Sequence, residues 1–145
     1  MRAEPQSAQD PGVAKIRALL LAARTDVAGD VRELSAAAHR RTALTPSTVP
    51  DRSAAIERMR KKIELLRAKV ESTTVSGPNA VSARALTVRA LLETDQALSK
   101  LAATYEAPDQ PSAIALISES VKLTAQAKAT SVQAGKALGI PWPLQ

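Results

Sequence analysis

The side chains best placed to do chemistry are three carboxylates, Asp26, Asp30 and Glu33. Their spacing of four and then three residues puts them on one face of a helix, where like charges repel one another. Either a divalent cation or a basic neighbouring helix would stabilise such a cluster, and a basic helix follows in the sequence. We therefore expect the three carboxylates to lie against cationic side chains of this protein.

The sequence lacks residues that several other kinds of active site require. The sequence has no Cys and a single His, His39, so a thiol nucleophile or a set of several His ligands for a metal is excluded. His39 falls in the last turns of a predicted helix, where a cationic side chain favours the helix dipole. The five Gly residues are scattered and form no phosphate-binding loop. We predict that the protein is not an enzyme and uses no cofactor or metal.

The basic helix is the segment 56–70, which holds six Arg or Lys residues and only two acids. Its apolar residues alternate as the a and d positions of a heptad: Ile56, Met59, Ile63, Leu66 and Val70. The four flanking positions are all positive, so a parallel homodimer along this seam would oppose like charges. The partner of the seam should instead have acidic edges. The predicted charged seam comprises Asp26, Asp30, Glu33, Arg60, Lys62, Arg67 and Lys69.

An antiparallel hairpin that turns near Ser47 would bring these acids and cations together. With equal rise on both sides, residue i lies opposite about 94 − i, which places Asp30 near Glu64 and Asp26 near Ala68. Exposed ion pairs contribute only about 0–1 kcal/mol each. We therefore expect them to select the register and topology of the hairpin rather than to hold it together.

Three Pro-containing breaks divide the chain, and every segment between them has helical periodicity. The predicted helices cover 13–43, 48–74, 79–106 and 109–138. Asp10 before Pro11 is a typical helix start, and Thr48 with Asp51 resembles a capping box. Gly29 is either simply tolerated or marks a close helix crossing. On the third and fourth helices, the residues expected to face inward are Val81, Ala85, Val88, Leu91, Leu92, Leu98, Ala102, Tyr105, Ile114, Ile117, Val121 and Thr124, with a neighbouring line of Leu116, Leu123, Ala127 and Ala134.

The expected fold class is all-α. Short connections make successive helices antiparallel neighbours, which predicts a long antiparallel up-down four-helix bundle or helical hairpins completed by oligomerisation. The predicted organisation is an N-terminal arm (1–12), a helical bundle domain (13–138) and a C-terminal extended arm (139–145). With no Phe, one Tyr and one Trp, the core is thin, so helices must approach closely or bury further area against other chains.

The C-terminal arm carries the only Trp, Trp142, between two prolines that stiffen it. Two positions are open to it. The Trp side chain either folds back over the end of its own bundle or anchors the arm in a pocket of a neighbouring subunit, since Trp is enriched among interface hot spots. In the second case Ile140, Trp142 and Leu144 are the partner-binding residues.

The longest apolar run, 18–23, is far too short to cross a bilayer, which takes about 20 residues. The polar start is unlike a signal peptide, so we expect a cytoplasmic protein without membrane contact, or one incorporated in a particle assembled in the cytoplasm. The expected function is that of a structural subunit that oligomerises or docks with other protein subunits, for example a phage virion component. The alternative is a small basic nucleic-acid-binding or regulatory protein, which the net charge of +6 permits. The mixed outer face and the scarcity of aromatic side chains count against it.

Overall fold

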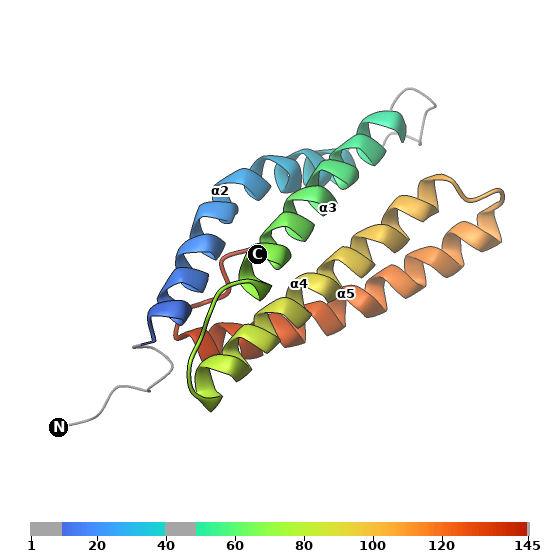
Figure 1. The fold of residues 1–145 in the computed structure, drawn as a ribbon. Helices are drawn as coiled ribbons and strands as arrows, with labels where there is room; N and C mark the ends of the chain where they lie inside the picture. Colours follow the sequence, from blue (N-terminus) through green and yellow to red (C-terminus); the bar gives the residue numbers. More distant parts are fainter. Residues whose placement is uncertain (1–9, 40–48, 145) are drawn as a thin grey trace.

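The computed structural model describes residues 10–39 and 49–144, with side chains for 10–32 and 53–144. These residues form four helices and no strand: α2 (Pro11–His39), α3 (Val49–Glu71), α4 (Pro78–Tyr105) and α5 (Gln110–Leu138). The all-helical prediction is confirmed for this part of the chain (Figure 1). None of the four helices combines the length and the apolar character that a bilayer crossing requires.

Polar capping groups set the ends of two helices at the predicted places. The Asp10 Oδ1 accepts hydrogen bonds from the backbone N–H groups of Gly12 at 2.7 Å and Val13 at 3.3 Å, so α2 begins at Pro11. The carboxylate of Asp109 accepts from the Ser112 N–H at 2.7 Å and caps α5. The predicted capping box of Thr48 and Asp51 falls outside the described side chains.

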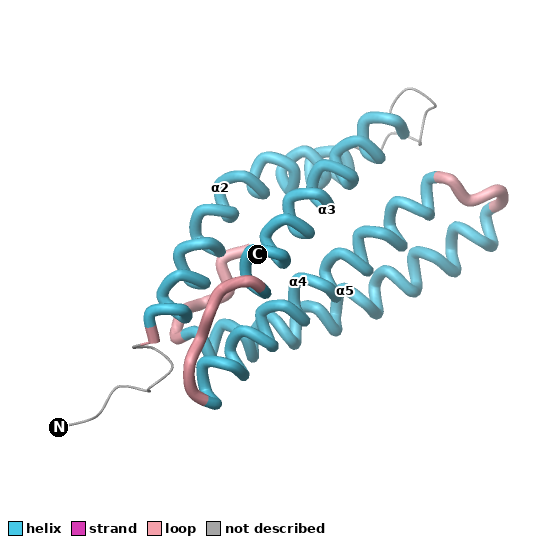
Figure 2. Tube along the Cα trace, viewed as in Figure 1, coloured by secondary structure: helices cyan, strands magenta, loops and turns pink. Residues whose placement is uncertain are grey.

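Helices that follow one another in the chain are neighbours in space. The interface between α4 and α5 is the most extensive, followed by those of α3 with α4 and of α2 with α3. Figure 1 shows α4 and α5 side by side along their length, and Figure 2 shows the short loops that enter and leave α4. Contacts pair Glu93 with Thr130 and Lys100 with Glu119, so residue numbers rise along α4 as they fall along α5.

The core lies mainly between α2, α3 and α4, and Leu138 and Trp142 complete it at one end. The whole predicted seam of α3 is buried, from Ile56 to Val70. On α2, Ile16 and Leu20 are fully buried as their spacing predicts. The predicted seam of α3 is therefore confirmed, and the described part of α2 buries Val13, Ile16, Leu20 and Val27.

The predicted inner faces of α4 and α5 are wrong in part. The residues that were predicted to face inward but are exposed are Val81, Ala85 and Leu92 on α4 and Ile114, Ile117, Val121 and Thr124 on α5. Leu91, Leu98, Ala127 and Ala134 are buried as predicted. The other buried residues of this interface are small or bear hydroxyl groups: Ala80, Ala83, Thr87, Ala90, Ala97, Ser120, Thr130, Ser131 and Gly135. Small side chains let two helix backbones approach closely over a long distance, and side-chain size at the contact sets the distance between helix axes. This close approach outweighs the burial of a few larger residues.

A glycine allows close approach at the start of α2 and not in its middle. A Cβ on Gly29 would meet no atom within 4 Å, so no close crossing lies there among the described residues. A Cβ on Gly12 would instead overlap the Thr74 carbonyl oxygen and lie 2.7 Å from Val75 Cγ1. The first turn of α2 is therefore packed against the connection between α3 and α4.

Candidate functional site

Asp30 is the carboxylate around which the cations of α3 gather. Its side chain is only 8% exposed, and it forms ion pairs with Lys62 Nζ at 2.8 Å and with Arg58 Nε at 3.4 Å. Lys62 also donates a hydrogen bond to the backbone carbonyl of Asp26 at 2.7 Å. One acid of α2 is thus held between two basic side chains of α3, and these contacts link the two helices.

Two cations of the predicted charged seam, Arg60 and Arg67, pair with acids outside this cluster. Arg60 pairs with Asp95 of α4 at 3.0 Å and with Glu57 at 3.1 Å. Arg67 pairs with Glu71 at 3.1 Å on its own helix. The prediction that Arg60 and Arg67 flank the acids of α2 is therefore wrong, because acids closer in space satisfy them. The other members are the exposed side chains of Asp26 and Lys69, and Glu33, whose side chain lies outside the described residues.

The observed register differs from the predicted one by about one helical turn. Asp30 lies across from Arg58 and Lys62 and not from Glu64. The predicted register assumed a tight turn at Ser47 with equal lengths on both sides, and the packing of the buried seam overrides that assumption. Arg58 was missed because the prediction considered only the four positions that flank the seam, and Arg58 is not one of them.

We expect Asp30 to make the stability of the fold depend on pH. Burial alone would raise its pKa, but the hydrogen bonds from Lys62 and Arg58 outweigh burial and hold the pKa below its ordinary value of 3.8. The stabilisation is therefore present above about pH 4 and is lost as the pH falls through the lower, folded-state pKa. Because Lys62 and Arg58 are 39% and 50% exposed, we expect Asp30→Asn to cost only about 1–2 kcal/mol at pH 7.

Thermal unfolding of the wild type and of Asp30→Asn between pH 2 and pH 7 checks this. The gap between the two melting temperatures should close as the pH falls below about 4. Asp26→Asn, which alters an exposed carboxylate on the same helix, is the matched control and should change little. A gap that stays constant down to pH 2 would show that the charge of Asp30 does not stabilise the fold.

The C-terminal arm folds back onto the end of its own bundle. Trp142 is 9% exposed and belongs to the core, and Ile140 and Leu144 are partly buried against it. The Ile140 N–H donates to the Gly135 carbonyl at 3.0 Å. A Cβ on Gly135 would lie 2.8 Å from the Ile140 carbonyl oxygen, so the arm crosses α5 where α5 has no side chain. Of the two predicted positions, the arm here takes the one within its own chain.

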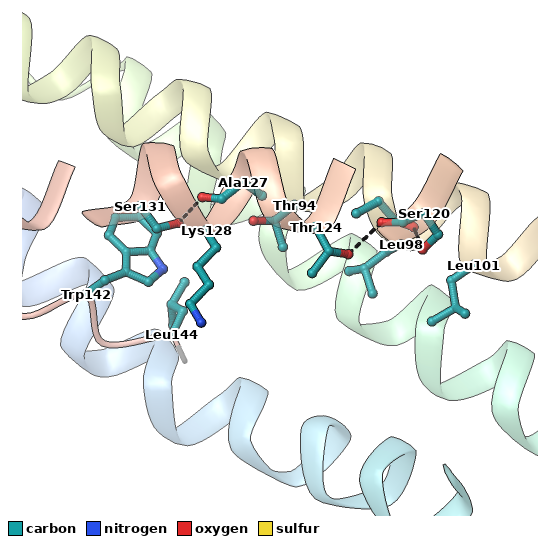
Figure 3. A pocket seen from close by; sticks show the side chains of 11 residues that line it. Thr94, Leu98, Leu101, Ser120, Thr124, Ala127, Lys128, Ser131, Trp142 and Leu144 are labelled. Atoms are coloured by element: carbon teal, nitrogen blue, oxygen red, sulfur yellow. Dashed lines mark hydrogen bonds between the residues drawn. The ribbon is translucent and has the colours of Figure 1, made fainter. Parts of the chain in front are cut away.

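A cleft of about 410 Å³ opens where this arm meets α4 and α5 (Figure 3). Its lining residues come from all three segments: Thr94, Ala97, Leu98, Leu101, Ser120, Thr124, Ala127, Lys128, Ser131, Trp142 and Leu144. Lys128 is the only one that carries a charge. Clefts of this size with mostly apolar walls and few polar groups are the usual form of ligand sites. The sequence pattern alone did not indicate it, because its walls exist only once the arm has folded back.

The hydroxyl groups in this cleft are already committed to backbone carbonyls. Ser120 donates to Ala97 O at 3.2 Å, and Thr124 donates to Ser120 O at 2.7 Å. Thr94 and Ser131 donate in the same way to carbonyls of their own helices, at 2.8 Å and 2.7 Å. The cleft therefore offers a ligand hydroxyl oxygens but no uncommitted hydroxyl proton, so its walls act as largely apolar surfaces.

One buried carboxylate, Glu93, was not expected from the sequence. Its side chain is 6% exposed and accepts a hydrogen bond from Arg89 Nε at 2.9 Å. Thr130 Oγ1, on α5, lies 2.9 Å and 3.2 Å from its two oxygens. The spacing of Arg89 and Glu93 indicates an ion pair along the helix, but its burial depends on where α5 crosses. Because protein groups satisfy it, Glu93 has a structural role in the α4–α5 interface.

Among the described side chains, no group of three or more His, Asp or Glu residues could hold a metal ion. The side chain of His39, like that of Glu33, falls outside that set. The candidate sites in the described part of the chain are therefore a mostly apolar cleft with one cation, Lys128, and the ion pairs of Asp30 between α2 and α3. A comparison with protein families, characterised proteins and solved structures found no match.

Proposed function

We propose that this protein is a non-enzymatic structural subunit that works by assembling with further copies of itself or with other protein subunits. In this proposal the fold is a long antiparallel up-down bundle with terminal arms, and its site of action is the cytoplasm or a particle assembled there, of which a phage virion is one example. The proposal depends chiefly on an apolar surface of α5 that has no partner within the described part of the chain.

This surface, the α5 stripe, comprises Ile114, Ile117 and Val121. Their side chains are 59%, 47% and 63% exposed, and spacings of three and four residues place them on one face of the helix. Isolated exposed apolar residues are common, but a contiguous row on a helix is typical of a surface that binds another protein. The small neighbours Ser118 and Ala125 would let a partner helix approach the stripe closely.

The charges of α3 favour assembly over the nucleic-acid alternative. Arg58, Lys62, Arg60 and Arg67 each pair with a carboxylate of the same chain. Neutralised cations attract phosphate less strongly than free ones, and nucleic-acid affinity depends on the number of phosphates neutralised. Nucleic-acid binding is therefore the second candidate, to be tested beside the first.

The test is the mass of the native protein over a hundredfold range of concentration, measured by light scattering after size exclusion. We expect a multiple of the chain mass that grows with concentration, and we expect Val121→Asp to shift it toward the monomer. Val81→Asp is the matched control, since it places the same charge on an exposed valine at the start of α4 and should leave the mass unchanged.

A wild-type protein that stays monomeric at every concentration would contradict self-assembly. An equal loss of mass in both valine variants would remove the α5 stripe from the proposal. Retention on double-stranded DNA that falls steeply with salt would favour the second candidate, because each phosphate contact adds about one unit to the slope of log affinity against log salt.

A further inference from the structure

We propose that the cleft between α4, α5 and the C-terminal arm binds an unbranched alkyl carboxylate, with the carboxylate at Lys128. The inference goes beyond assembly and does not depend on it. It follows from the chemistry of the cleft walls and from the position of their only charge.

The walls suit an alkyl chain. Leu98 and Leu101 line one side, Ala127 lies on α5, and Trp142 and Leu144 close the end that the arm forms. Because the hydroxyl groups of the cleft already donate to backbone carbonyls, a ligand rich in hydrogen-bond acceptors would find no hydroxyl donor there. An alkyl chain has no hydrogen bonds to lose on entering.

The single charge sets the chemistry of the other end of the ligand. Figure 3 shows the Lys128 side chain extending from α5 toward the side of the cleft on which Leu144 lies. Within the described part of the chain, no carboxylate forms an ion pair with Lys128, whereas Lys62 and Lys100 each pair with an acid. An exposed ammonium group at the rim of an apolar cleft complements an anionic head group in water beside an apolar body.

The protein carries its own reporter for this binding. Trp142 is the only Trp in the sequence, so all indole fluorescence comes from it. Because Trp142 lines the cleft, this fluorescence should change when a ligand enters. We would titrate the full-length chain with decanoate below the concentration at which decanoate forms micelles. Decyltrimethylammonium, with the same chain and the opposite charge, is the matched ligand.

We expect a saturable change in Trp142 emission with decanoate and a much weaker one with decyltrimethylammonium. Lys128→Gln should weaken decanoate binding about fivefold, the effect of one partly exposed ion pair. Lys122→Gln, on another face of the same helix, is the control and should bind decanoate like the wild type. Thr124→Phe places a ring in the mouth of the cleft and should weaken both ligands, with helicity by circular dichroism confirming that the variant folds.

The proposal is overturned if decanoate gives no saturable change in emission, if both ligands bind equally well, or if Lys128→Gln binds decanoate like the wild type. Binding that survives unchanged in a folded Thr124→Phe variant would place the ligand elsewhere and also overturn it. The mass measurement that tests assembly does not move with any of these outcomes, so the two proposals fail separately.

Discussion

Replacement of Trp142 by Ala should lower the free energy of unfolding by about 3–5 kcal/mol, the usual loss for a large buried aromatic side chain. The side chain is 9% exposed and packs into the core at the end of the bundle. The core has no Phe to share this role, because the sequence contains none. Urea denaturation followed by circular dichroism measures the loss without relying on the deleted fluorophore.

The same experiment separates an arm held in its own chain from an arm exchanged between chains. With the arm bound within its own chain, the cost of Trp142→Ala should be equal at protein concentrations a hundredfold apart, because no association step is involved. Val132→Ala, which alters an exposed valine on α5, is the control and should cost no more than about 0.5 kcal/mol. A cost that shrinks on dilution, together with a loss of oligomer in Trp142→Ala, would support docking of the arm in a neighbouring subunit.

Replacement of Gly12 by Ala should cost about 2–3 kcal/mol, at the upper end for overpacking. The added Cβ would overlap the backbone oxygen of Thr74, which cannot rotate away as a side chain can. The first turn of α2 would have to move away from the connection between α3 and α4. That movement would disturb the bonds from the Ser76 N–H and hydroxyl to Asp10, at 3.1 Å and 2.8 Å.

Gly29→Ala makes the same chemical change in the same helix and serves as the control. A Cβ there meets nothing within 4 Å, so the variant should be as stable as the wild type or up to about 1 kcal/mol more stable, as helix propensity predicts. Equal melting temperatures for the two alanine variants would mean that the start of α2 does not touch the connection between α3 and α4.

Much of the helical organisation was predictable because it depends on neighbours in the chain. Pro and Gly residues mark the breaks between the helices. Asp10 and Asp109 cap the starts of α2 and α5 by accepting hydrogen bonds from N–H groups two or three residues further along the chain. The buried seam of α3 was equally predictable, because its larger apolar residues recur regularly along one face of the helix and that face turns toward the core.

The candidate site was less predictable, because it depends on which helices approach one another. Periodicity assigned Ile117 and Val121 to the core, yet α4 and α5 pack through Ala, Ser, Thr and Gly and leave both residues exposed. The partner of Arg60 could not be read from spacing either, since Asp95 is 35 residues away and becomes a neighbour only when α3 lies against α4.

The sequence by itself determined that the described segments are helical, about where their helices begin, and that the chain has no Cys and one His, because these properties depend on local bonding and composition. Only the tertiary structure decided which face of α5 stays uncovered, which acids meet the basic residues of α3, and that Trp142 closes a cleft with Lys128 at its rim. Those outcomes depend on close packing between segments far apart in the chain, and small differences in side-chain volume at a helix crossing change them.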